Sequence, residues 1–248
     1  MDENIYLKYG ALAQIYDEFM GFVSYDSWVE LIQKLCAEHG FAQDVKILEI
    51  GGGTGFLGRK LINSGFLYQG SDLSFAMTKA AKSKGLDFVC ADSRNLPFNG
   101  KFNIILFLFD GINYLFEPQD FKKTFEEVHR LLDKGGLFLF DITTQENSQR
   151  NFLNYREALC EKTFAYVRES YYDPQNSVQH NDFDIFIRLA DGNYGRFNEK
   201  HKQKIYPVRD ICGFIPKNLF ETLGIWGDFK RKKYTKKSER VHFLLHKK

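Results

Sequence analysis

Two carboxylates and a run of glycines form the part of the sequence best suited to chemistry. The apolar run VKILEI (45–50) contains Glu49 and leads directly into the glycine-rich segment GGGTGFLG (51–58). Glycines let the backbone turn sharply and let a ligand approach without a Cβ in the way. Asp72 stands 19 residues beyond Gly53 in the next apolar segment, where a carboxylate can accept hydrogen bonds from both hydroxyls of a ribose. The pattern predicts a loop that binds a nucleoside-containing cofactor at the carboxyl end of a buried strand.

This loop has two interpretations. GTGFLG (53–58) satisfies the GxGxxG pattern of dinucleotide-binding proteins, and the spacing to Asp72 also suits a dinucleotide. EIGGGTG (49–55) instead places an acidic residue ahead of the glycines. A dinucleotide brings a pyrophosphate anion, which favours helix N–H groups without a nearby carboxylate. S-adenosylmethionine brings an ammonium, a sulfonium and no phosphate, so Glu49 favours the second interpretation.

EIGGGTG resembles the acidic-x-Gly-x-Gly-x-Gly first motif of class I S-adenosylmethionine-dependent methyltransferases. Further matches follow in order: Met77 in FAMTKAAK, Asp92 with its neighbour Ser93 after the third apolar segment, and FLFDGINYL (107–115) after the fourth. The last is close to a pattern of small-molecule N- and O-methyltransferases. YGALAQIYDEFM (9–20) resembles an element that covers the cofactor in that subset. The resemblance covers about residues 6–145 and is weaker beyond them.

The resemblance implies a cofactor site for S-adenosylmethionine, with S-adenosylhomocysteine as the product and no metal. Asp72 would hold the ribose and Asp92 would lie near the adenine amine, although each could simply cap a helix or begin a turn. Asp110 has the same turn-forming alternative. The cofactor-binding residues expected on this basis are Tyr9, Glu49, Gly51, Gly53, Gly55, Asp72, Leu73, Met77, Asp92, Ser93 and Asp110.

Candidate catalytic residues lie further along the chain. GRFNEKHKQKIYP (195–207) resembles an E-x-H-x-x-x-x-Y segment of some family members, and on a strand Glu199 and His201 share one face. If that face looks at the cofactor's methyl group, His201 is a general base or a substrate holder; otherwise the face is merely solvated. Tyr16 and Tyr114 are the other catalytic candidates, with a packing role as the alternative. Methyl transfer from an activated cofactor needs alignment more than a strong base.

Alternating apolar strands and helices predict a doubly wound, mostly parallel seven-stranded sheet with helices on both faces and an antiparallel last strand. Helical spacing in the first forty residues predicts a lid. Strands are expected at 45–50, 66–74, 86–92, 102–110 and 137–142, with helices at 54–64 and 118–132. A helix at 207–223 and antiparallel strands at 225–234 and 240–247 are expected to complete the core.

The alternation ends near residue 145. Strands at 162–173, 178–190 and 193–206, joined by turns at 174–177 and at Asp191-Gly192, predict an inserted antiparallel sheet. We therefore expect a core of residues 1–145 and 207–248, with residues 1–40 as a helical lid, and an inserted β cap of residues 146–206.

Composition and charge limit the classes of partner and the cellular location that we expect. The net charge is +2 over 248 residues, the four cysteines are widely spaced, and the first ten residues lack an apolar signal segment, so we expect a cytoplasmic protein that does not associate with membranes. The basic run KRKKYTKK (230–237) falls at a predicted hairpin tip, where charge needs no partner, so nucleic acid is not expected. Monomer and homodimer both stay open.

These observations predict methyl transfer to a nitrogen or oxygen of a small molecule. The sequence has no Asn/Asp-Pro-Pro-aromatic tetrad and no Pro-Cys dipeptide, which argues against methylation of DNA adenine amino groups and of cytosine carbon. The alternatives are an RNA or protein methyltransferase, a cofactor-binding module without activity, and an NAD-dependent reductase.

Overall fold

The computed structural model describes residues 9–248 and contains two β-sheets joined by the chain around residue 145. Residues 1–8, the start of the predicted lid, lie outside the described residues. Two helices open the described chain, α1 (Leu12–Phe19) and α2 (Tyr25–Glu38). The core then alternates through β1 (Lys46–Ile50), α3 (Phe56–Asn63), β2 (Leu67–Asp72), α4 (Phe75–Ser83), β3 (Phe88–Cys90), β4 (Phe102–Phe107), the 3-10 turn η1 (Gly111–Tyr114), α5 (Pro118–Leu131) and β5 (Leu132–Thr143).

The larger sheet has seven strands in the order β10-β11-β5-β4-β1-β2-β3. The pairs from β3 to β5 are parallel, whereas β11 (Arg240–Lys247) runs antiparallel to both β5 and β10 (Phe220–Trp226). This arrangement confirms the predicted fold. The order reverses at β1, with β2 on one side and β4 on the other, and such a switch point is where parallel sheets bind ligands.

Helices cover both faces of this sheet, which is why β1, β4 and β5 read as nearly continuous apolar runs. One face packs against α5 and the short α7 (Val208–Phe214), and the other against α2, α3 and α4. Neighbouring residues of β1 separate accordingly: Ile47 joins the second cluster and Leu48 the first. Among the described residues, no helix combines the length and apolarity that a membrane span needs.

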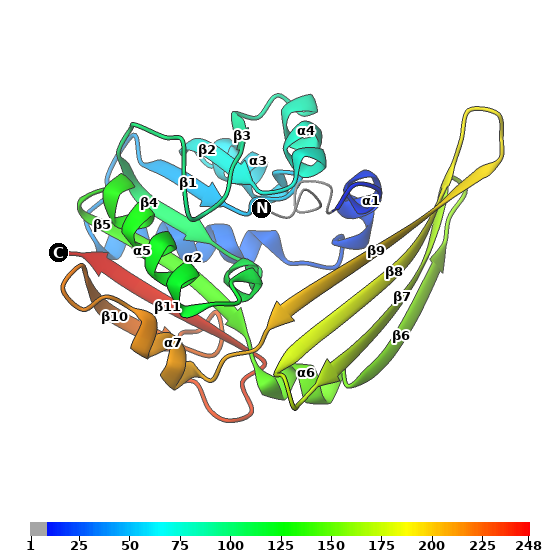
Figure 1. Cartoon of the computed structure of the whole chain (residues 1–248). Helices are drawn as coiled ribbons and strands as arrows, with labels where there is room; N and C mark the ends of the chain where they lie inside the picture. The colour runs from blue at the N-terminus through cyan, green and yellow to red at the C-terminus, as the bar shows by residue number, and fades with distance from the viewer. Residues whose placement is uncertain (1–8) are drawn as a thin grey trace.

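The smaller sheet is antiparallel in the order β6-β7-β8-β9 and extends away from the core as a curved blade, with α1 lying against its inner side (Figure 1). Its strands are β6 (Asn154–Cys160), β7 (Phe164–Asp173), β8 (Val178–Arg188) and β9 (Tyr194–Lys204). Phe183 and Ile185 of β8 pack against Leu12 and Ile15 of α1. Helix α1 therefore packs against the smaller sheet, whereas α2 packs against a face of the larger one.

Two predicted elements are wrong in their bounds, and two observed elements were not predicted. The helix expected at 207–223 ends at Phe214, because Pro216 follows Ile215 and disfavours helical backbone there. The strand expected at 225–234 is β10, which ends at Trp226, and residues 227–239 form a loop. The sequence reasoning also missed α6 (Gln145–Asn151), which Thr144 caps with its side chain, and strand β6 of the smaller sheet.

Candidate functional site

The glycine loop leaves the carboxyl end of β1 in left-handed conformations. Gly51, Gly53 and Gly55 have φ angles of 66°, 58° and 77°, values that residues with a Cβ rarely adopt. Gly55 directly precedes α3, and a Cβ there would lie 2.2 Å from a side-chain carbon of Leu86. The spacing of the glycines thus follows from the backbone conformation and from close packing behind the loop.

Asp72 holds the glycine loop from the end of β2. Its two carboxylate oxygens accept backbone N–H groups, Oδ2 from Gly53 at 2.9 Å and Oδ1 from Ser74 at 2.8 Å. Each oxygen has a second lone pair, so the carboxylate can still accept two hydroxyl donors. Burial raises the pKa of Asp72 to about 6, although the N–H groups of Ser74 and Gly53 act in the opposite direction.

Glu49 lies buried at the end of β1, beside the glycine loop. Its Oε2 accepts a hydrogen bond of 2.5 Å from the hydroxyl of Tyr68, whose ring leaves no room for a Cβ at Gly58. Burial raises the pKa of Glu49 to about 7, despite the opposing effect of the Tyr68 hydrogen bond. A nearby cation would favour the ionised form of this carboxyl.

These groups open onto a first cavity of ≈ 490 Å³, a volume typical of a small-molecule site. Two of the predicted cofactor-binding residues are absent from its lining: Gly55 lies behind the loop, and Asp110 faces elsewhere. The structure brings together at this cavity the predicted residues Tyr9, Tyr16, Glu49, Gly51, Gly53, Asp72, Leu73, Met77, Asp92, Ser93 and Tyr114.

Asp92 lies at the far side of this cavity and is held by Arg94. The guanidinium contacts both carboxylate oxygens, with Nη2 2.6 Å from Oδ2, and Nη1 also bonds Asp120. Burial would raise the pKa of Asp92, but the hydrogen bonds and charge of Arg94 outweigh it and lower that pKa. Asp92 is therefore a fixed, ionised acceptor, and Ser93 beside it bonds Thr124 at 3.2 Å.

Three tyrosines separate the first cavity from a second one. The hydroxyls of Tyr9 and Tyr114 hydrogen-bond to each other, and the Tyr9 and Tyr16 rings meet edge to face with centroids 6.2 Å apart. Tyr9, Tyr16, Tyr114 and Phe109 line both cavities. Burial raises the pKa of all three tyrosines well above the usual value, so they are neutral phenols near pH 7. They can orient a ligand but cannot serve as bases.

The second cavity, of ≈ 940 Å³, lies between the core and the smaller sheet. Side chains alternate between the faces of a strand, and the residues of β6 to β9 that line this cavity all lie on one face of the sheet. The strand register pairs Ser170 with Asn181 and Asn181 with His201, which forms one polar row on this face. The next row on the same face, two residues along each strand, contains Glu157, Arg168, Phe183 and Glu199.

His201 is buried in this row rather than solvated. Its Nε2 lies 3.2 Å from Oε2 of Glu199, and its ring centroid lies 4.1 Å from that of Tyr9. Oε1 of Glu199 accepts the N–H groups of Ala11 at 2.7 Å and Leu12 at 3.0 Å. Burial would raise the pKa of Glu199, but the bonds from His201 and these N–H groups lower it, so Glu199 is ionised. A single carboxylate thus ties His201 to the start of α1.

Asp110 belongs to the second cavity and not to the cofactor side. Arg240 pairs with it at 2.6 Å and also with the buried Asp141, and Gln203 of β9 donates to its carboxylate. The structure therefore gives the predicted cofactor residue Asp110 a different set of partners. Tyr206, the last residue of the segment containing His201, donates to the Phe116 carbonyl at 2.6 Å and packs in the core.

Sequence reasoning missed four charged residues in the second cavity, Arg150, Glu157, Arg168 and Arg240. Arg168 carried a usable signal, because it interrupts the buried face that β7 otherwise forms from Phe164, Tyr166, Ser170 and Tyr172. A charged residue at such a position needs a partner inside the protein. Arg240 begins a strand after a long basic run and had no comparable signal.

Comparison with known proteins agrees with this geometry. A model of the methyltransferase domain family matches residues 47–136, from β1 into β5. A protein of Geobacillus sp. (strain WCH70), whose name assigns it to the methyltransferases without a substrate, is 29% identical over 97% of this chain and 100% of its own. The structure of an S-adenosylmethionine-dependent methyltransferase from Clostridium acetobutylicum ATCC 824 is 28% identical and superimposes with a TM-score of 0.81, covering 96% of this chain and 98% of the other. KedS8, a sugar N-methyltransferase from Streptoalloteichus sp ATCC 53650, is 18% identical and shares the fold over 92% of each chain with a TM-score of 0.73.

The seven-stranded sheet with its antiparallel last strand, and the glycine loop at its switch point, define a Rossmann-like methyltransferase. The chain has the class I fold and is an S-adenosylmethionine-dependent methyltransferase, with S-adenosylmethionine as its cofactor. The chemistry of the first cavity fits that cofactor, since Asp72 offers two free acceptor positions and Glu49 provides a carboxylate for a cation. The dinucleotide interpretation of the loop is set aside.

Proposed function

We propose that this enzyme transfers a methyl group to a nitrogen or oxygen of a small molecule bound in the second cavity. The observation that carries the proposal is the meeting of the two cavities at Tyr9, Tyr16 and Tyr114. A donor in the first cavity and an acceptor in the second would face each other across these rings. In-line transfer needs this opposed arrangement and the exclusion of water.

The cofactor-binding roles follow from the first cavity. We assign Asp72 to the ribose hydroxyls, Glu49 to the side of the cofactor's ammonium, and Asp92 with Ser93 to the adenine end. Gly51 and Gly53 provide close backbone approach, while Leu73 and Met77 line the apolar wall. The bound cofactor supplies an electrophilic methyl group on a sulfonium.

The tyrosines and His201 are assigned to the acceptor side. Neutral phenols at Tyr16 and Tyr114 can hydrogen-bond the acceptor's nitrogen or oxygen and orient its lone pair. In the tautomer that Glu199 favours, His201 carries its proton on Nε2 and its lone pair on Nδ1. Nδ1 makes no hydrogen bond within residues 9–248 and is covered, with the Tyr9 ring packed on the imidazole. A shift of Tyr9 would let Nδ1 accept the acceptor's proton.

We treat residues 146–206 as the cap that forms the acceptor cavity, and residues 1–145 with 207–248 as the cofactor-binding core. A cavity of ≈ 940 Å³ next to the tyrosines leaves room for an acceptor, which favours an enzyme over an inactive binding module. An RNA or protein substrate would be favoured if the basic run 230–237 shared one surface with Lys200 and Lys202. Those two lysines line the first cavity from the opposite face of β9 to His201, whereas the basic run follows Phe229, which lines the second cavity.

The test is methyl transfer from methyl-labelled S-adenosylmethionine to a panel of small amines, phenols and polyols, with total RNA and denatured protein run in parallel. We expect label in at least one small molecule. His201→Ala should lower its turnover without changing cofactor affinity, whereas His180→Ala, on the other face of β8, should leave both unchanged. Label found only in RNA or protein would contradict the proposal, as would equal turnover in the His201 and His180 variants.

A further inference from the structure

Arg168 is a largely buried cation in the polar rows of the cap sheet. It stands on β7 in the row of Glu157, Phe183 and Glu199, next to the row of His201. Its side chain is 16% exposed, and it lines the second cavity. A guanidinium removed this far from water needs partners, so its hydrogen bonds show whether it is already satisfied.

The guanidinium is oriented but incompletely bonded. Of its five N–H bonds, Nε–H donates to Ser170 Oγ at 3.0 Å and one on Nη2 donates to Asn181 Oδ1 at 2.7 Å. Nη1 lies 3.6 Å from Oε1 of Glu157, which gives an ion pair without a hydrogen bond. Within the described chain, the remaining three N–H bonds have no hydrogen-bond acceptor. The ring of Phe152 lies 4.9 Å from the guanidinium carbon and helps fix its plane.

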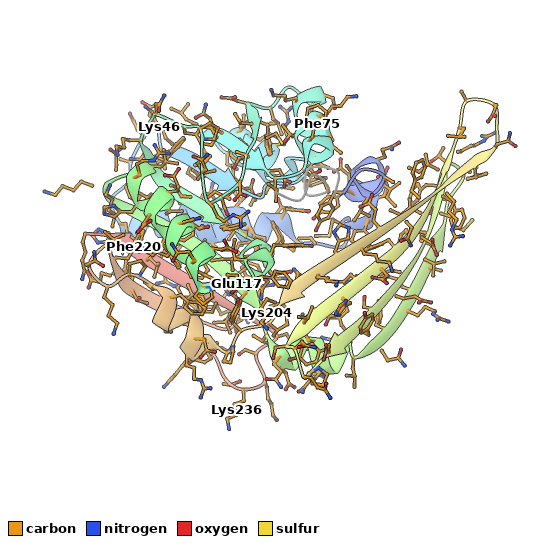
Figure 2. All side chains as sticks on the ribbon, in the orientation of Figure 1. Lys46, Phe75, Glu117, Lys204, Phe220 and Lys236 are labelled. Carbon is orange, nitrogen blue, oxygen red and sulfur yellow. The ribbon has the colours of Figure 1, made fainter. Side chains whose placement is uncertain are left out.

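Arg168 differs from the other two arginines that line this cavity. Arg240 is hydrogen-bonded to Asp110 and Asp141 and Arg150 is paired with Glu239, whereas Glu157 lies 3.6 Å from Arg168 without a hydrogen bond. The loop of residues 227–239 begins near Phe229 and leads to Arg240, both of which line the cavity, and Figure 2 shows Lys236 projecting outward from this loop. A basic segment at a cavity raises the local concentration of anionic ligands. The exposed lysines of this loop are Lys230, Lys232, Lys233, Lys236 and Lys237.

We propose that the acceptor is an anionic small molecule and that Arg168 binds its anionic oxygens, a statement that rests on the proposed function of the second cavity. Carboxylate and phosphate share the required chemistry, since both present two coplanar acceptor oxygens to the open edge of a guanidinium. The anionic group would sit on β7, and the methylated group would lie toward β9 and the tyrosines. The acceptor therefore carries its anionic group several bonds away from the nucleophile.

Glu157 provides a second, independent consequence. Its carboxylate competes with an incoming anion for Nη1 and repels it, because both are negative and only a few ångströms apart. Neutralising Glu157 should tighten anion binding. If Arg168 only held the sheet together, the same change would not affect anions at all.

The test uses the full chain saturated with S-adenosylhomocysteine and two probes, inorganic phosphate and succinate. Each is titrated by calorimetry and by following the Nε–H NMR signal of Arg168, assigned with the Arg168→Lys variant. We expect one saturable site below about 10 mM for the preferred anion, and the stronger of the two identifies phosphate or carboxylate as the natural group. Arg168→Gln should weaken it at least tenfold, and Glu157→Gln should tighten it about threefold.

Arg156→Gln is the matched control, because this arginine lies on the other face of β6 with its side chain 74% exposed and paired with Glu169. It should bind both anions like the wild type. No saturable binding of either anion, equal binding by the Arg168→Gln variant, or no tightening in the Glu157→Gln variant overturns the proposal. Cofactor binding and methyl transfer are measured separately, so failure here leaves the proposed function standing, and a circular dichroism spectrum of each variant checks that it is folded.

Discussion

Glu49 makes cofactor binding depend on pH. Burial raises its pKa to about 7 and that of Asp72 to about 6 in the free protein, so both carboxyls are largely protonated at pH 5.5. The positively charged cofactor favours their ionised forms, so binding releases protons and affinity rises with pH. From pH 5.5 to 7.0, the ionised fraction rises about 16-fold for Glu49 and about fourfold for Asp72, hence about 60-fold if the ionised forms alone bind.

The assay is calorimetric titration with S-adenosylmethionine at both pH values in buffers of different ionisation enthalpy. The cofactor's own α-ammonium stays mostly charged in this range. Glu49→Gln should leave only the fourfold dependence that belongs to Asp72, while Glu221→Gln, an exposed residue of β10, should keep the full dependence. An unchanged slope in Glu49→Gln would refute the reasoning, and Glu49 would then only support the loop through Tyr68.

Three further changes test the site. Asp72→Ala should weaken cofactor binding by more than about 1 kcal/mol, since hydrogen bonds to a carboxylate contribute about 1.5–3 kcal/mol, and unchanged affinity would remove Asp72 from the ribose site. Gly58→Ala should lower the melting temperature by an overpacking cost of about 1–3 kcal/mol, because its Cβ would lie 2.3 Å from the Tyr68 ring. Gly213→Ala, with open space around it, should not lower it, and equal melting of the two variants would contradict the packing argument. Glu199→Gln should lower turnover and weaken the hydrogen bonds from the Ala11 and Leu12 N–H groups at the start of α1, so amide exchange there should be faster. Unchanged exchange would show that Glu199 does not stabilise the start of α1.

Local chemistry made much of the core predictable. The loop after β1 needs glycines because residues with a Cβ rarely adopt its positive φ angles, and Asp72 at the end of β2 is placed to accept the N–H of Gly53. The doubly wound seven-stranded sheet follows from alternating strands and helices, because the helices must cover both faces of a parallel sheet. Each of these features depends on residues that lie close together in the sequence, so it can be predicted from one sequence.

The cap was less predictable, because its meaning depends on contacts between distant segments. His201 and Glu199 share a face as the strand period requires, but only the docking of α1 makes that face buried. Asp110 matched a family position in sequence, yet Arg240, 130 residues later, is one of the residues that occupy its carboxylate in the structure. The end of α7 was misjudged because helical spacing across 207–223 was given more weight than Pro216.

The most direct measurement of the central claim is calorimetric titration of the purified protein with S-adenosylmethionine, with NADH as the control. We predict binding at one site with a dissociation constant in the micromolar range for S-adenosylmethionine, and no heat above dilution for NADH. Binding of NADH alone would contradict the account, because it would mean that the loop between β1 and α3 receives a pyrophosphate rather than a sulfonium cofactor.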